Sequence, residues 1–412
     1  MSVLADIVAR NRAGEAVAIP SYCTAHPETL AAIFGCYRDD DSPILIEATC
    51  NQVNQFGGYT GMTPAAFRRF VEDIATAQGI DPARLILGGD HLGPNPWKNE
   101  PAGQAMDKAR AMVGAYVAAG YTKIHLDASM RCADDTTLDE TTMAARAADL
   151  CAVAESVATD PLHYIIGTEV PVPGGETALL DALAVTTPAA ATLTYELHRD
   201  AFAARGLSDG FARVIGLVVQ PGVDFGNRQI FAYDPAKAAA LIAAVPAGRV
   251  YEAHSTDYQT EPALTALVQG HFAILKVGPE LTFAFRQAVM ALEQLEHMLA
   301  PVQPSHLQAT LRQVMHDDPT QWRAYVAGGA RQQAMMIFGL SDRVRYYWPD
   351  PAVRAALERL FSNIRQASPE PGLVAQVTGG LVQMHDPAHL PEQVIARMVG
   401  AVVMKYRNAT GG

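Results

Sequence analysis

The sequence predicts a (β/α)8 barrel with a C-terminal helical extension. Short apolar runs rich in β-branched residues alternate with alanine-rich helical stretches, eight such runs occur in series, and the runs stop near Pro301. Such alternation is typical of parallel strands covered by helices, and eight units favour a closed barrel over an open sheet. No G-x-G-x-x-G or Walker motif follows the first run, which disfavours a nucleotide-binding or kinase fold.

The expected strands are the apolar runs themselves, each bounded by turn residues. They lie at 17–20, 44–47, 85–88, 123–127, 164–168, 214–219, 249–253 and 272–276. Helical periodicity between and after them predicts helices that include 64–78, 105–119, 140–159, 260–269 and 281–299. The 412 residues exceed what a barrel needs by roughly 100. We therefore expect a barrel over 1–300 and a helical extension over 301–412 packed on it.

Composition excludes several function classes. Charged residues make up 18% of the chain and the formal net charge is −12, so no basic field is available for nucleic acid or an anionic membrane. The five cysteines are scattered and odd in number, which argues against a disulfide framework. No apolar run reaches the length of a spanning helix, and the charged N-terminus is not a signal peptide. We expect a cytoplasmic protein.

Polar residues stand at the carboxyl ends of nearly all expected strands, where a barrel builds its active site. In chain order they are Glu47, Asn51, Asn54, Asp90, His91, Asp127, Ser129, Glu169, Glu176, Gln220, His254, Asp257 and Lys276. So many carboxylates, imidazoles and amides would repel or desolvate one another without a bound cation or a polar ligand. The pattern predicts a metal site at the barrel mouth.

His91 and His254 are the best candidate ligands, and Glu169 and Gln220 could complete the set through oxygen. The alternative is that each imidazole is a hydrogen-bonded structural residue. The remaining histidines, including His26, His125, His163 and His198, are interpreted as structural, although His26 in the first loop stays open.

Two acids suit proton transfer. Asp90 precedes His91 and could shuttle a hydroxyl proton, or it could only orient a ligand. Glu176 follows Gly174 and Gly175 in a loop able to close over substrate, or it is a solvated acid. The amide-rich loop with Asn51 and Asn54 suits hydroxyl recognition on a sugar, or it is a capped turn.

Several stretches resemble the Z-subunit (GatZ/KbaZ) family of class II tagatose-1,6-bisphosphate aldolase. They are IEATCNQVNQFGGYTGMTP, GGDHLGPNPW, KIHLDASM, IIGTEVPVPGGE, VVQPGV, VYEAHSTDYQT, FAILKVGP and SDRVRYYWP, and they run from the barrel into the extension. The resemblance implies a class II aldolase barrel and one divalent ion, Zn, Mn or Mg. Family members include noncatalytic partners of an aldolase Y-subunit, proteins named tagatose-6-phosphate kinase, and 4-epimerases of tagatose or its 6-phosphate.

The resemblance also implies residue roles. Asp90 and His91 match a proton donor and a metal ligand, His254 matches a second ligand, and Glu169 and Glu176 match two acids. Three positions depart from class II aldolases. Gln220 stands where a metal histidine is expected, Asp257 lies where glycine and serine surround the C1 phosphate, and Gly278 replaces an asparagine that contacts the dihydroxyacetone phosphate end.

These departures favour a ketose with a free C1 hydroxyl. We expect metal-dependent retro-aldol epimerisation at C4, converting D-tagatose 6-phosphate to D-fructose 6-phosphate, although a free ketose substrate stays open. The 6-phosphate requires a cation, for which Arg343 or Arg345 is the candidate and Lys276 the second choice. The alternative function is a noncatalytic subunit that stabilises an aldolase Y-subunit. We also expect a homo-oligomer.

Overall fold

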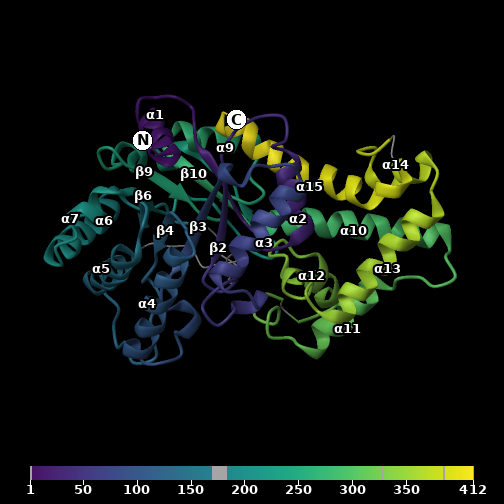
Figure 1. The fold of residues 1–412 in the computed structure, drawn as a ribbon, viewed down its shortest axis with the longest axis horizontal. Helices are drawn as coiled ribbons and strands as arrows, with labels where there is room; N and C mark the ends of the chain where they lie inside the picture. The colour runs from purple at the N-terminus through teal and green to yellow at the C-terminus, as the bar shows by residue number, and fades with distance from the viewer. Residues whose placement is uncertain (1, 169–182, 327, 384–385, 412) are drawn as a thin grey trace.

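The computed structural model describes residues 2–168, 183–326, 328–383 and 386–411. Eight parallel strands close into a barrel in the order β1-β10-β9-β6-β5-β4-β3-β2 (Figure 1). The strands are β1 (Ile19–Cys23), β2 (Ile44–Thr49), β3 (Leu85–Leu92), β4 (Lys123–Leu126), β5 (His163–Ile166), β6 (Val214–Val218), β9 (Val250–Ala253) and β10 (Phe272–Val277). Pairing of β1 with β10 closes the ring. The predicted fold class is confirmed.

All eight expected strands are present, and β3 differs most from its expected length. It continues through Asp90 and His91 to Leu92, because Thr49 of β2 still pairs with Asp90. Gly88 permits this close approach, since a Cβ there would lie 2.7 Å from Cγ of the buried Glu47. The additional antiparallel pair β7 (Asp224–Phe225) and β8 (Ile230–Phe231) was not expected, because two-residue strands carry no readable periodicity.

Helices surround the barrel. They are α1 (Val3–Arg12), α2 (Pro27–Gly35), α3 (Pro64–Ala77), α4 (Ala102–Ala118), α5 (Glu140–Val157), α6 (Pro188–Ala204), α7 (Ser208–Ala212), α8 (Pro235–Ala243), α9 (Glu261–Gln269) and α10 (Pro279–Leu299). Several begin with a capping side chain followed by proline, as at Thr63-Pro64 and Thr187-Pro188. The cap accepts a first-turn N–H, and proline donates none and has the helical φ already.

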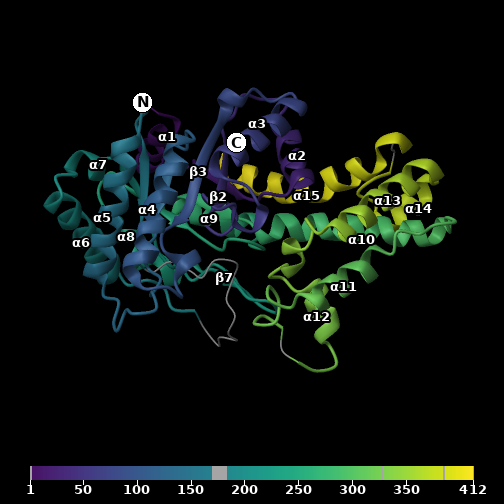
Figure 2. The same ribbon diagram turned by 60° about the horizontal axis from the view of Figure 1, so that its bottom comes forward.

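The extension contains α11 (Leu307–Asp317), α12 (Gln332–Phe338), α13 (Pro351–Ala367), α14 (Pro371–Thr378) and α15 (Leu390–Thr410). Helices α11 to α14 lie to one side of the barrel, and α10 and α15 run between the two parts (Figures 1 and 2). The returning α15 packs against α2, α9, α10 and β1, so it stands where the eighth helix of the ring is needed. The division at residue 300 stays a prediction. No helix in the described ranges combines the length and apolarity needed to cross a bilayer.

Candidate active site

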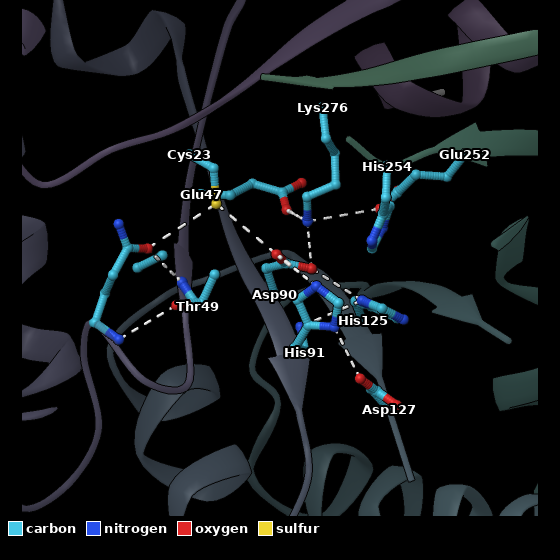
Figure 3. Close-up of polar contacts among 12 residues, drawn as sticks. Cys23, Glu47, Thr49, Asp90, His91, His125, Asp127, Glu252, His254 and Lys276 are labelled. Atoms are coloured by element: carbon cyan, nitrogen blue, oxygen red, sulfur yellow. Dashed lines mark hydrogen bonds and ion pairs between the residues drawn. The ribbon is translucent and has the colours of Figure 1, made fainter. Parts of the chain in front are cut away.

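The barrel mouth gathers charged side chains from five strands, β2, β3, β4, β9 and β10. Lys123 and His125 lie on β4 with Asp127 just after it, and Glu252 lies on β9 with His254 just after it, at alternating positions. Alternate residues of a strand point to one face, so both sets project into the barrel. Figure 3 shows His125, Asp127, Glu252 and His254 converging with Asp90 and Lys276. All are buried.

Two lysines neutralise part of this cluster. Lys123 Nζ lies 2.5 Å from Glu47 Oε1 and 2.8 Å from Glu252 Oε2. Lys276 Nζ lies 2.9 Å from Glu47 Oε2 and forms an ion pair with Asp90. Burial lowers the pKa of Lys276, but Asp90 and Glu47 outweigh burial and raise it well above its ordinary value. Lys276 is therefore an ammonium group, which is a poor nucleophile for Schiff-base formation.

Three imidazoles stand together beside the lysines. The ring centroid of His254 lies 4.9 Å from that of His91 and 5.2 Å from that of His125. Burial, with the charge of Lys276, lowers the pKa of His254 to about 3, and its Nε2 lies 2.8 Å from Glu252 Oε1. A neutral imidazole keeps a lone pair for a metal ion.

Asp90 is held as a carboxylate. Burial raises its pKa, but the charges of His91 and Lys276 and the hydrogen bond from His125 hold it well below its usual range. Its Oδ1 lies 2.9 Å from His125 Nδ1. His91 Nδ1 lies 2.8 Å from Asp127 Oδ2, and Ser129 donates to the other oxygen of Asp127. Asp90 is therefore ionised, which is the form that binds a cation or accepts a proton.

The cluster has the composition of a divalent metal site. Asp90, His125, Glu252 and His254 each offer one ligand atom, and these atoms lie within 4.8 Å of one another. His125 Nε2 is buried and has no hydrogen-bond partner among the described residues. The four carboxylates of the cluster (Glu47, Asp90, Asp127 and Glu252) face two ammonium groups (Lys123 and Lys276), which leaves two negative charges, or one when His91 is protonated as its raised pKa favours. A divalent cation would balance them.

The backbone is strained where the site begins. His91, near the end of β3, has φ 50°, and Ser255, just after β9, has φ 53°. A left-handed conformation is uncommon for residues other than glycine, and it persists where the surrounding structure enforces it.

The cluster opens into a cavity of about 320 Å³. Asp90, His91, His254 and Lys276 form one part of its wall. The helical extension forms another part with Arg345, Tyr346, Trp348 and Arg354. The cavity is therefore shared between the barrel and the extension.

Seven of the residues predicted from sequence line this cavity: Asn51, Asp90, His91, His254, Asp257, Lys276 and Arg345. Three more, Glu47, Asp127 and Ser129, lie behind it, bonded to residues of the cluster. The predicted ligand Glu169 and the predicted acid Glu176 lie outside the described residues.

Within the described part of the chain, three further predicted residues, Asn54, Gln220 and Arg343, neither line the cavity nor bond to the cluster. Asn54 accepts hydrogen bonds from the N–H groups of Phe56 and Gly58, at 2.9 and 3.1 Å. Gln220 Oε1 accepts from the N–H groups of Gly222 and Val223, at 2.8 and 2.9 Å. Arg343 stacks on Tyr325 and Tyr346. Each of these side chains is engaged with its own loop or its immediate packing neighbours.

Asp257 caps a helix instead of standing free in the cavity. Its Oδ1 accepts from the N–H groups of Gly278 and Glu280, at 3.0 and 2.8 Å. These groups belong to the N-terminus of α10, which is an anion-binding position. Burial and the neighbouring Glu280 raise the pKa of Asp257 to about 7. The carboxyl group thus occupies a place where a phosphate could otherwise bind.

Sequence reasoning missed three residues of the cluster. His125 was expected to be structural, and Lys123 and Glu252 were not considered, yet all three face the barrel interior with fully buried side chains. A signal was present. In KIHLD and VYEAH, charged or imidazole residues alternate with apolar ones, which places them all on one face of a strand. These positions precede the carboxyl ends of the strands, where barrel active sites are ordinarily expected.

Comparison with known proteins gives a consistent result. The family model "D-tagatose-1,6-bisphosphate aldolase subunit GatZ/KbaZ-like" matches residues 4–411. The D-tagatose-1,6-bisphosphate aldolase subunit GatZ of Salmonella enteritidis is 51% identical over 379 residues, covering 90% of each chain. The GatZ protein of Salmonella newport is 50% identical over 379 residues with the same coverage. The crystal structure of a probable tagatose 6 phosphate kinase from Sinorhizobium meliloti superposes with a TM-score of 0.86 at 45% identity, covering 95% of this chain and 100% of that one.

Proposed function

We infer the function of this chain from the premise that it belongs to the GatZ/KbaZ-like family of D-tagatose-1,6-bisphosphate aldolase subunits, a family of carbohydrate metabolism. We propose that its barrel mouth performs retro-aldol-type chemistry on a tagatose-type ketose phosphate, with C4 epimerisation of D-tagatose 6-phosphate to D-fructose 6-phosphate as the net reaction. The observation that carries this proposal is the buried Asp90–His125–His254–Lys276 cluster, which lies at one cavity.

The reaction breaks and remakes one bond. Loss of the proton from the C4 hydroxyl, with cleavage between C3 and C4, leaves an aldehyde at C4 and an enediolate on the C1–C3 fragment. If the aldehyde presents its opposite face before the bond re-forms, C4 is inverted and the proton returns to the C4 oxygen. The reaction therefore requires a base at C4 and positive charge near the C2 oxygen.

Asp90 is the proposed base, because it lines the cavity as a carboxylate. Lys276 is the proposed fixed cation, since it lies beside Asp90 and stays protonated. Glu176, from the glycine-rich segment, remains the proposed second acid. Asn51 lines the cavity and is proposed to bind a sugar hydroxyl.

A divalent ion fits this donor set. His125, His254 and Glu252 would hold it, with His91 and Asp90 adjacent, and Glu169 and Gln220 remain proposed oxygen ligands. When bound, such an ion polarises the ketose carbonyl and stabilises negative charge on the C2 oxygen. The net negative charge of the cluster and the unpartnered His125 Nε2 support this occupancy, with Zn, Mn and Mg as candidates.

Asp257 supports the choice of a substrate with a free C1 hydroxyl. It fills the N-terminus of α10 and adds negative charge when ionised. A C1 phosphate would have to displace it or lie beside it at a Coulombic cost. Tagatose 6-phosphate avoids this conflict.

A second function, as a subunit of D-tagatose-1,6-bisphosphate aldolase, is supported more directly by the relatives' names than epimerisation is. In this second function, the chain binds and stabilises a catalytic Y-subunit. The ordered acid, ammonium and imidazole groups around the cavity are not needed for stabilisation alone, and this favours catalysis by the chain itself. A cytoplasmic location and a homo-oligomer remain part of the proposal.

The test incubates the purified chain alone with D-tagatose 6-phosphate and, separately, with D-tagatose 1,6-bisphosphate, each with Zn, Mn or Mg. Formation of fructose 6-phosphate from the first sugar supports the epimerase. Triose phosphate release from the bisphosphate would show a true aldolase. Inactivity on both sugars, with strong activation of an added Y-subunit, would establish the accessory function.

A further inference from the structure

Arg345 places a positive charge at the cavity without a matching carboxylate. It donates from Nη1 to the carbonyl oxygens of Ser341 and Asp342, and from Nη2 to the hydroxyl of Tyr346 at 3.0 Å. Among the described residues, no carboxylate forms an ion pair with it. The nearby Asp342 is engaged elsewhere, because its carboxylate oxygens bind Arg286 at 2.7 Å and Thr282 at 2.6 Å. A partly buried cation without a counter-charge favours an anionic ligand.

Two tyrosines flank this arginine on the same wall. The rings of Tyr59 and Tyr346 are 4.7 Å apart between centroids, and both residues line the cavity. Tyr59 belongs to the loop after β2, whereas Tyr346 belongs to the extension. Barrel and extension therefore meet at Arg345 and present hydroxyl groups beside the guanidinium.

A second cation and an open helix end lie on the same cavity. Arg354 of α13 lines it, with Nη1 3.2 Å from Glu28 Oε1. The N-cap of α2 is His26, which makes no side-chain capping bond and lines the cavity, and its buried Nε2 has no partner among the described residues. The α10 N-terminus differs, because Asp257 already fills it. Of these two helix ends, that of α2 has no capping side chain, and the carboxylate in its first turn, Glu28, is paired with Arg354, so this end can still meet an anion.

We propose that Arg345, Tyr59 and Tyr346, assisted by Arg354 and the N-terminus of α2, form the binding site for the phosphate ester of the substrate, at the end remote from the reacting C2–C4 atoms. The inference rests on the proposed function and deepens it. A phosphate monoester offers three terminal oxygens and up to two charges, which suits two guanidinium groups and two hydroxyls. The extension is thereby a specificity element of the barrel.

The test compares Arg345→Gln with Arg359→Gln by titration calorimetry. Arg359 is an exposed arginine on α13, so its substitution is matched for charge and chemistry. The ligands are D-tagatose 6-phosphate, D-tagatose and D-tagaturonate. The Arg345→Gln change should weaken binding of the 6-phosphate on the order of 30-fold, as expected for loss of a charge-assisted pair, and leave binding of free tagatose unchanged. The Arg359→Gln change should alter neither affinity.

Tyr59→Phe is the second variant, because it removes one hydroxyl and keeps the ring packing. It should weaken binding of the 6-phosphate about fivefold, as expected for loss of one hydrogen bond. Equal affinities of wild type, Arg345→Gln and Tyr59→Phe for the 6-phosphate would overturn the binding site. If tagaturonate bound more tightly than the 6-phosphate, and this binding depended on Arg345, the assignment of the site to a phosphate would be overturned. The wild-type chain could also bind the 6-phosphate without turning it over, while Arg345→Gln loses that binding. This result would support the binding site and reject the epimerase.

Discussion

Removing the charge of Asp257 should change how strongly the cavity discriminates between D-tagatose 6-phosphate and D-tagatose 1,6-bisphosphate. In Asp257→Asn, the amide oxygen can still accept from Gly278 and Glu280, so the cap on α10 is kept while the carboxylate is lost. Two unit charges 4 Å apart repel by about 4 kcal/mol at an effective dielectric of about 20. Allowing for partial solvent screening, we expect the variant to bind D-tagatose 1,6-bisphosphate about 30- to 1,000-fold more tightly, relative to the 6-phosphate, than wild type does.

The pH dependence of this effect has a definite sign. Because the pKa of Asp257 is raised to about 7, the wild-type carboxyl group is mostly neutral at pH 6 and mostly charged at pH 8.5. The difference between wild type and Asp257→Asn should therefore be small at pH 6 and large at pH 8.5. Both proteins meet the same ionisation of the ligand phosphate, so the comparison isolates Asp257. Dissociation constants from calorimetry give the result without requiring turnover.

Stability supplies an independent check on the same group. An unperturbed aspartate, as in the unfolded chain, has a pKa of 3.8, whereas the pKa of Asp257 in the folded protein is about 7. The folded state therefore retains the proton of Asp257 to higher pH than the unfolded state does. Wild-type stability should then fall as pH rises from about 4 to 7, by at most about 4 kcal/mol at 1.4 kcal/mol per unit of pKa. Asp257→Asn should lose this decline in urea denaturation. If Asp257→Asn and wild type had the same affinity for the bisphosphate relative to the 6-phosphate at pH 8.5, the account of Asp257 would be refuted.

Three further substitutions test the cluster. His254→Ala should remove most bound divalent ion, measured by elemental analysis, because one lost imidazole leaves too few ligands; full metal content would reject the site. Asp90→Asn should fold and retain metal while turnover falls on the order of 100-fold, and a near-normal rate would limit Asp90 to orienting a ligand. Lys123→Met should destabilise the fold by about 3–5 kcal/mol in urea denaturation, since Glu47 and Glu252 would keep buried charges without their partner, and wild-type stability would contradict the ion-pair network.

The fold could be predicted because each strand carries its own signal. Apolar runs and helical periodicity are local properties, and all eight barrel strands were located within a few residues. The position of α15 beside α2 and α9 could not be predicted in this way. It depends on where a chain segment returns in space, and no local pattern in the segment after Pro301 reports that.

The site was predicted only in part, for a geometric reason. Asp90, His91, His254 and Lys276 follow from the rule that active-site residues lie at strand ends. His125 and Glu252 lie one step further inside the barrel, where a polar residue is ordinarily excluded, so the rule passed over them. The capping role of Asp257 depends on the helix that follows a different strand, β10, and sequence could only indicate its charge.

The most direct test of retro-aldol epimerisation by this barrel is product analysis in D2O. D-tagatose 6-phosphate is incubated with the chain and a divalent ion, and the fructose 6-phosphate formed is examined by NMR. Cleavage between C3 and C4 leaves the hydrogen on C4 attached throughout, so the account predicts fructose 6-phosphate with protium at C4. Deuterium at C4, or no fructose 6-phosphate with any of the three metals, would contradict it.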